Sequence, residues 1–503
     1  MSALEPLRRA AEAFLRELSR EEYRALAGLK PSAELQPIYA RHARAIDDEA
    51  LGMARDAWAG AAEGTAERRS AALLLEWLVD QHAARALAAH DERTLDWEAN
   101  ATIRLEDGGS LPYQRASIAM ANAADRDERL AIERARAAVV GRELAPLRRE
   151  RLQRELEMIG ELGLADGYVA TFTTLTGIDL DALAAQCEAF LRETESMWED
   201  TARTLFKARL GLGLGEPTRA DALHLFRFGT FDAGFPARAM EPAVRRQVAE
   251  MGMSPDADGR VVYDTGEREG KRARAFCAPV RVPEEVYLVL RPHGGQQDWN
   301  TLLHELGHAL HFANMRADLP TEARWLGDNS VTEGWAMLFD HLMHDRGWLA
   351  RYTQLDAKDV PAFRRALGTS ELHMLRRYCA KLLYELAVYR GDAPWEALPD
   401  LYVDRLGQAT SFRYPTADAF VDLDPRFYSA RYLRAWQLQA VVTRTLVERF
   451  DEDWYRNPRS GPWVLEELFA PGQQERGDEV AARVSGTPLD FAPLVRGIEE
   501  MLG

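Results

Sequence analysis

Residues 298–311 read DWNTLLHELGHALH and contain an HExxH pattern that runs from His304 to His308. Residues four apart lie one turn apart on the same face of a helix, so both imidazoles can reach one cation. Glu305 lies on the adjacent face, close to such a cation but outside its ligand set. The pattern therefore predicts an apolar helix with Asp298 as its N-cap, two metal ligands, and Glu305 as general base.

A second helical segment follows at residues 328–342, DNSVTEGWAMLFDHL, and carries two acidic candidates. Catalytic zinc sites usually take a third protein ligand and keep one position for water. Glu333 lies among apolar residues, where an unpaired carboxylate is costly, and metal coordination would offset that cost. An internal ion pair would also offset that cost, and a position of Glu333 on a solvated face would avoid it. Asp340 lies two turns further on the same face, placed either to accept the free N–H of a ligand histidine or to lie at the surface.

Four further histidines lie near these two segments. His311 is one turn beyond His308 and is expected to pack in the core. His341 and His344 are expected to have a structural or exposed role. His293 lies in the Gly-rich loop before the HExxH helix, where it can touch a substrate.

Residues 261–290 interrupt a sequence that is otherwise helical in pattern. Short strands are expected at 261–263, 273–278 and 286–290, separated by turns that contain Gly or Pro. Elsewhere apolar residues recur at three- and four-residue spacing, notably over 3–18, 64–90, 124–160, 362–390 and 430–450. We therefore expect a mostly α protein with one small β-sheet beside the active-site helix. We divide it into an N-terminal helical part, residues 1–190, and a catalytic part, residues 191–503, although no linker sequence marks the boundary.

The composition excludes several classes of protein. The chain of 503 residues has a formal net charge of −17, which argues against nucleic-acid binding. Its three cysteines, at positions 187, 277 and 379, are too far apart in sequence for a CxxC metal site or a disulfide framework. No apolar run is long enough to span a bilayer, and the charged N-terminus lacks the apolar region of a signal peptide. We expect a cytoplasmic protein that binds neither nucleic acid nor membrane, with its oligomeric state left open.

Three blocks of the sequence resemble the thimet oligopeptidase and oligoendopeptidase F family of zinc peptidases. They are residues 270–277, GKRARAFC, then the HExxH helix with its glycine before the second histidine, and then Glu333 with Asp340 seven residues later. The spacing from His304 to Glu333 also matches the family. The resemblance implies that His304, His308 and Glu333 hold one Zn²⁺ per chain and that Asp340 supports a ligand histidine.

A fourth block, residues 427–436, FYSARYLRAW, is similar to a late helix of that family and of the more distantly related angiotensin-converting enzyme. There a tyrosine stabilises the oxyanion, which implies a catalytic role for Tyr432 and a substrate contact for Tyr428. The family usually has a histidine about ten residues earlier, whereas no histidine follows His373 here. The resemblance further implies a two-lobed helical body around a deep channel that admits short peptides.

These observations predict a zinc-dependent oligopeptidase in which Glu305 activates water for attack on internal bonds of short peptides. The strand near Ala275 and Phe276 is expected to pair with the substrate backbone, or to serve only as internal sheet. One alternative is a zinc carboxypeptidase or dipeptidyl carboxypeptidase of related helical fold. Another is a non-catalytic protein that retains zinc, although such a protein has no need of Glu305. A non-zinc hydrolase is disfavoured because no GxSxG elbow or P-loop is present.

Overall fold

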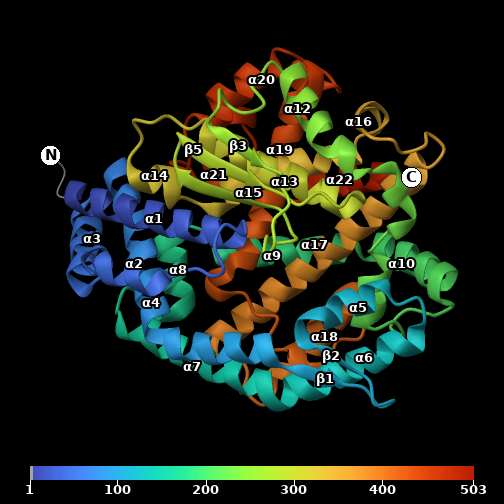
Figure 1. The fold of residues 1–503 in the computed structure, drawn as a ribbon. Coiled ribbons are helices and arrows are strands. Elements are labelled where there is room, and N and C mark those ends of the chain that lie inside the picture. The colour runs from blue at the N-terminus through green and yellow to red at the C-terminus, as the bar shows by residue number, and fades with distance from the viewer. Residues whose placement is uncertain (1–3) are drawn as a thin grey trace.

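The computed structural model describes residues 4–503, and most of them are helical (Figure 1). The first helices are α1 (Glu5–Leu26), α2 (Leu35–Arg41), α3 (Asp48–Gly60), α4 (Ala66–Asn100), α5 (Ala116–Asn122), α6 (Arg126–Val139), α7 (Ala145–Glu161), α8 (Gly167–Thr176), α9 (Leu180–Glu193), α10 (Glu195–Leu210), α11 (Arg219–Leu225) and α12 (Met240–Glu250). After the main sheet follow α13 (Gln296–Ala313), α14 (Thr321–Trp325), α15 (Asn329–Asp340), α16 (Arg346–Tyr352), α17 (Val360–Arg390), α18 (Leu398–Thr410), α19 (Tyr428–Phe450), α20 (Ser460–Trp463), α21 (Gly477–Ser485) and α22 (Ala492–Leu502).

The helical stretches expected from the apolar spacing are confirmed to within a few residues at most ends. They correspond to α1, α4, the run from α6 to α7, α17 and α19. The stretch expected at 64–90 continues ten residues further, to the end of α4, and residue 3 lies outside the described residues. Local chemistry sets the starts. Thr65, for example, accepts a hydrogen bond from the backbone N–H of Arg68 and so caps α4.

The expected small sheet is present beside the HExxH helix. It consists of β3 (Val261–Asp264), β4 (Phe276–Arg281) and β5 (Glu285–Val289) in the order β3-β5-β4. β3 runs parallel to β5, and β4 runs antiparallel to it. The outer strand β4 therefore has one edge free of strand pairing, and α13 packs against β4 and β5.

A second, two-stranded sheet was not expected. β1 (Thr102–Arg104) and β2 (Ser110–Pro112) pair antiparallel in a hairpin. The turn between them contains Asp107, Gly108 and Gly109, and Gly108 has a positive φ of 88°. This is a hairpin signal that a three-residue strand is too short to reveal by apolar alternation.

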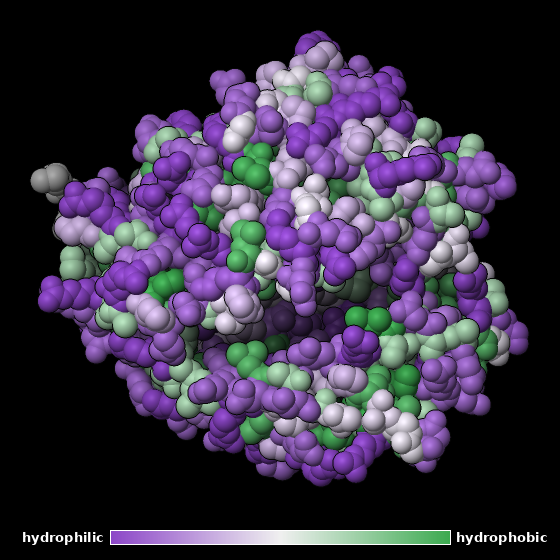
Figure 2. All heavy atoms as spheres, in the orientation of Figure 1, coloured by the Kyte–Doolittle hydropathy of each residue, from purple (hydrophilic) through white to green (hydrophobic). Residues whose placement is uncertain are grey.

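The face seen in Figure 2 is deeply hollowed between the part of the molecule that carries the main sheet and the part that carries α5 and the β1–β2 hairpin. One core cluster contains Phe14, Leu78 and Leu372, and so joins residues from both sides of position 190. A second cluster, with Leu288 and Leu338, lies around the main sheet and α13. The boundary near residue 190 stays a prediction.

The N-terminal helix packs on the main sheet. Ser19 donates a hydrogen bond to the carbonyl of Pro279 in β4, at 2.6 Å. The ring of Tyr23 stacks on that of Tyr287 in β5, with centroids 3.9 Å apart. α1 therefore covers the part of β4 beyond Ala278. None of the described helices combines the length and apolar character that crossing a membrane requires.

α13 and α15 approach so closely at Gly307 that no side chain fits between them. A Cβ added to Gly307 would lie 2.5 Å from the carbonyl oxygen of Trp335 and 2.6 Å from Cα of Ala336. On its other side, α15 packs on α19, where a Cβ on Gly334 would lie 3.0 Å from Leu438. α15 is thus held between the HExxH helix and the helix that carries the two candidate tyrosines.

We expect Gly307→Ala to destabilise the protein by about 1–3 kcal/mol, because the added methyl group meets backbone atoms that cannot rotate away. Gly52→Ala in α3 is the matched control, since a Cβ there meets nothing within 4 Å. Because alanine favours helix over glycine, this control should leave stability unchanged or slightly raised. Urea denaturation measures both variants, and equal stabilities would contradict the close contact.

Candidate metal centre

The HExxH helix begins at a glycine and not at Asp298. Gly295, with φ 87° and ψ 159°, is the N-cap, so the prediction of Asp298 as N-cap is wrong. Asp298 lies in the first turn, and its carboxylate accepts hydrogen bonds from the backbone N–H groups of His293 and Gly294, at 2.8 and 2.9 Å. It therefore holds the Gly-rich loop against the start of α13, and it places His293 at the entrance to that helix.

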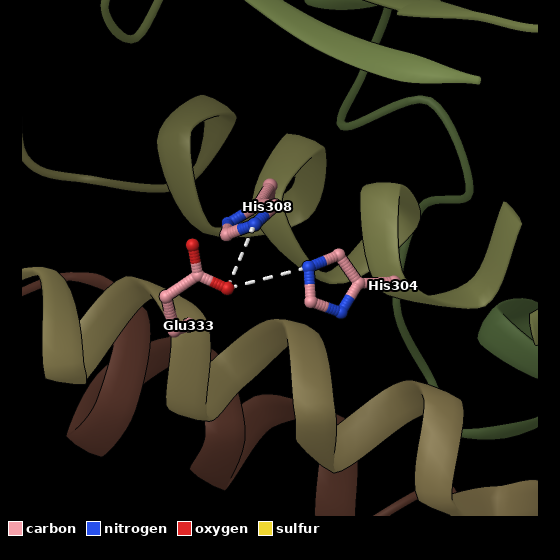
Figure 3. Close-up of side chains that lie close together, drawn as sticks. All are labelled: His304, His308 and Glu333. Atoms are coloured by element: carbon pink, nitrogen blue, oxygen red, sulfur yellow. Dashed lines mark ion pairs between the residues drawn. The ribbon is translucent and has the colours of Figure 1, made fainter. Parts of the chain in front are cut away.

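His304, His308 and Glu333 converge on one point. Nε2 of His304 lies 3.3 Å from Oε2 of Glu333, and Nε2 of His308 lies 3.7 Å from the same oxygen. Figure 3 shows the two imidazoles reaching from α13 toward one carboxylate oxygen on α15. The ligand atoms of the three residues all lie within 4.8 Å of one another. The structure thus brings together the three residues expected to hold a metal.

The remaining nitrogen of each histidine has a partner that fixes the ring. Nδ1 of His304 donates to Oδ2 of Asp340 at 2.9 Å, because a carboxylate can only accept. Nδ1 of His308 lies 3.0 Å from the hydroxyl of Thr332, which is placed to accept its proton. Both rings then turn Nε2 toward Glu333. Asp340 occupies the supporting position expected for it, whereas Thr332 was not anticipated.

The charges in the centre favour a cation. Although burial opposes it, the hydrogen bond to Asp340 and the nearby Glu333 carboxylate raise the pKa of His304 to about 10. Burial lowers the pKa of His308 to about 4, so this imidazole is neutral at pH 7. In the metal-free protein His304 thus holds a proton between two carboxylates. A divalent ion would replace that proton, and its binding should weaken as the pH falls.

The geometry passes a direct test of fit for a metal. Oε2 of Glu333 is buried and has no hydrogen-bond partner among residues 4–503, although buried carboxylate oxygens are almost always paired. Two imidazole nitrogens face this oxygen, and the three side chains keep 16 %, 13 % and 10 % of their surface exposed. Two nitrogens and one carboxylate with access to solvent are a donor set suited to zinc.

Glu305 lies beside the ligands but does not join them. Its Oε2 accepts a hydrogen bond from the backbone N–H of Cys277 in β4, at 2.8 Å. Burial raises the pKa of Glu305, and the neighbouring His304 opposes that rise. A carboxylate that burial makes more basic, held next to a metal centre by a backbone donor, is suited to accept a proton from water.

The two candidate tyrosines lie one turn apart at the start of α19 and differ in their partners. The hydroxyl of Tyr428 donates to Oε1 of Glu333 at 2.7 Å. The hydroxyl of Tyr432 forms no hydrogen bond with any residue from 4 to 503, and its ring stacks on Tyr378 with centroids 5.8 Å apart. Burial and the nearby Glu333 carboxylate both raise the pKa of Tyr432. Tyr428 therefore supports a ligand, while Tyr432 offers a free donor near the centre.

The candidate substrate-binding residues Ala275 and Phe276 lie at the start of β4. Ala275 is buried, and Phe276 is half-buried and pairs with Val289 of β5. The strand begins at residue 276, so the expected start at 273 was too early. The edge of β4 faces Glu305 at Cys277, and α1 covers the strand further along. Substrate pairing by this strand stays a prediction.

His311 is fully buried against Phe312 and Phe469, as expected for a packing residue.

One group near the centre was not predicted from the sequence. Glu371 of α17 lies beside His341 and His344 because α17 packs on the end of α15. No pattern in the sequence links Glu371 to the two histidines.

The fold and the site define a class of protein, namely a mostly helical protein in which an HExxH helix and a following helix bring together a His–His–Glu group that could hold a metal. No protein-family model matches the chain, and no curated protein sequence matches it. The family resemblance therefore remains an expectation that rests on the motif blocks.

We expect His308→Ala to lose the metal bound at this centre, and Thr332→Val to weaken it about 10–100-fold, as loss of a supporting hydrogen bond typically does. His293→Ala is the control and should bind normally, because His293 lies outside the ligand set. Competition with a chelating dye measures zinc affinity, and the zinc that Glu333→Ala abolishes is assigned to this centre. Full affinity in His308→Ala would remove His308 from the ligands.

Proposed function

We propose that the protein is a zinc-dependent peptidase that hydrolyses internal bonds of short peptides, with His304, His308 and Glu333 as the zinc ligands. The observation that carries this proposal is the unpaired oxygen of Glu333 facing two histidine nitrogens, with Glu305 adjacent but outside the ligand set. A purely structural zinc site is normally closed by four protein ligands and has no use for a neighbouring base.

A bound zinc ion would supply Lewis acidity, which lowers the pKa of water and polarises a carbonyl group. Glu305 takes a proton from the attacking water and delivers it to the leaving amine. Its bond to the N–H of Cys277 holds one carboxylate oxygen and leaves the other available for that proton. Asp340 and Thr332 keep the ligand imidazoles in orientation throughout.

Tyr432 is the better candidate for stabilising the oxyanion. Tyr428 already donates its proton to Glu333, so its role is to position that ligand. The Tyr432 hydroxyl is uncommitted and lies within electrostatic range of Glu333 and Arg274. A donor that is free before the reaction can form its hydrogen bond as negative charge develops on the substrate oxygen.

The molecule is hollowed on the face seen in Figure 2. A peptide bound in such a hollow would be short and unfolded, because a recess admits an extended chain more readily than a folded domain. Beside Glu305, the unpaired edge of β4 supports main-chain recognition, because an extended peptide can add to a free strand edge. Such recognition depends little on side chains.

Arg274 favours a second candidate function, the removal of residues from the C-terminus of peptides. This side chain is exposed, forms no salt bridge within residues 4–503, and acts electrostatically on both Glu305 and Tyr432. A free guanidinium near a peptidase centre can bind a terminal carboxylate.

The deciding experiment incubates zinc-loaded protein with a mixed peptide library and identifies the products by mass spectrometry. Internal cleavage is expected, whereas release of single residues or dipeptides from C-termini would favour the Arg274 alternative.

We expect Glu305→Gln to keep its zinc and its hydrogen bond to Cys277 while turnover falls by about two or more orders of magnitude. Glu157→Gln, an exposed position on α7, should be unaffected. Near-normal cleavage by Glu305→Gln would exclude Glu305 as base.

Tyr432→Phe removes one hydroxyl and keeps the ring, so we expect turnover to fall roughly ten- to a thousand-fold with zinc affinity unchanged. Tyr378→Phe, in the same aromatic cluster, is the control and should remain active. Tyr428→Phe should instead weaken zinc binding, because Glu333 loses its donor. The roles of the two tyrosines would be reversed if Tyr428→Phe kept its zinc and lost turnover while Tyr432→Phe stayed active.

A further inference from the structure

A second group of metal-ligating side chains lies next to the first centre. His341 and His344 belong to the single turn of 3₁₀ helix that follows α15, and Glu371 belongs to α17. Nε2 of His341 lies 3.0 Å from Oε1 of Glu371, and Nδ1 of His344 lies 3.4 Å from Oε2. The ligand atoms of these three residues lie within 4.8 Å of one another, as they do in the first centre.

Asp340 orients a histidine in each group. Its Oδ2 accepts from Nδ1 of His304 at 2.9 Å, and its Oδ1 accepts from Nδ1 of His341 at 2.5 Å. An imidazole that donates from Nδ1 keeps the lone pair of Nε2 for a cation. One carboxylate thus sets the same ring orientation in both groups, and each Nε2 points at a different glutamate. A carboxylate that holds a histidine in this way is the usual support of a metal ligand.

Two buried carboxylates lie at the second group. They belong to Asp340 and Glu371, and neither forms a salt bridge with a lysine or an arginine within residues 4–503. A buried carboxylate is costly unless a positive partner compensates it. A divalent ion held by Glu371 and the two imidazoles would supply such a partner.

The second group is open to solvent on its own side. It lines a pocket of about 530 Å³ together with Asp345, Gln439 and Glu500. The side chains of His341 and His344 keep 14 % and 22 % of their surface exposed, and that of Glu371 keeps 7 %. An ion can therefore enter from this pocket, and water can complete its coordination.

We propose that His341, His344 and Glu371 form a second site for a divalent transition metal of the zinc type, coupled to the first centre through Asp340. Two imidazole nitrogens and one carboxylate with open positions suit Zn²⁺ or Co²⁺ better than Mg²⁺ or Ca²⁺, which prefer oxygen ligands. The site goes beyond the proposed peptidase function and does not depend on it.

The test counts zinc and not turnover. Protein stripped with a chelator is dialysed against Zn²⁺, and the bound metal is measured by inductively coupled plasma mass spectrometry. We expect two zinc ions in the wild type, one in His308→Ala, one in His344→Ala or Glu371→Gln, and almost none in the combined His308→Ala, His344→Ala variant. His82→Ala on α4 is the control and should keep both ions. A wild type with one zinc that His308→Ala abolishes and His344→Ala retains would overturn the proposal.

Circular dichroism shows whether each variant is folded, and a second measurement needs no variant. Crystals of the zinc-loaded wild type, measured on both sides of the zinc absorption edge, locate every ordered zinc ion. A peak between His341, His344 and Glu371 supports the second site. A peak at the first centre with none at the second shows instead that His341 and His344 form only a buried ion-pair network with the two carboxylates.

Discussion

The contact of α13 with α15 at Gly307 is the constraint on which the candidate metal centre depends. Two ligands come from one helix and the third from the other, so the distance between the helix axes decides whether Glu333 reaches the imidazoles. That distance is short because no Cβ separates the backbones. α19 then fixes the far side of α15 and supplies both tyrosines. The side chains proposed to hold and support a metal therefore stand on three packed helices, which position them more rigidly than loops would.

Asp340 has two roles in this arrangement. It lies at the end of α15, and its two carboxylate oxygens accept hydrogen bonds from His304 and from His341. Buried carboxylates cost free energy unless a positive partner compensates them. Glu333, Asp340 and Glu371 are all buried, and their side-chain partners within residues 4–503 are histidines and the hydroxyl of Tyr428. Cations would offset this cost, so the folded state and the metal-bound state should favour each other.

The parts of the site that follow from local spacing were predictable from the sequence. His304 and His308 need only the helical repeat, and the apolar setting of Glu333 made it a candidate before any partner was known. Asp298 was wrongly predicted as the N-cap because an N-cap depends on backbone angles, and it is Gly295, three residues earlier, that adopts the capping conformation. Tyr428 and Tyr432 share one helix, so only packing against α15 shows which of them meets Glu333.

Contacts between segments that are distant in the sequence could not be predicted from it. Glu371 lies in the middle of a long helix that shows no irregularity in its sequence, and only the packing of α17 brings it to His341. Thr332 resembles any buried threonine until His308 is seen beside it. The β1–β2 hairpin is too short for its alternation to exceed chance. The sequence therefore identified which residues converge at the first centre, but not the residues that surround them.

The position of α1 on the main sheet has a consequence for how the chain folds. The partners of α1 include Pro279 in β4 and Glu322 in α14, the latter 314 residues beyond Arg8, so the helix is synthesised well before them. Until those segments have been synthesised, the side of α1 that carries Ser19 and Tyr23 has no sheet beneath it. Folding that depends on contacts between such distant residues is slow, and it leaves aggregation-prone surface exposed until those contacts form. A fragment of the chain that ends before β4 should therefore leave that side of α1 exposed and tend to aggregate.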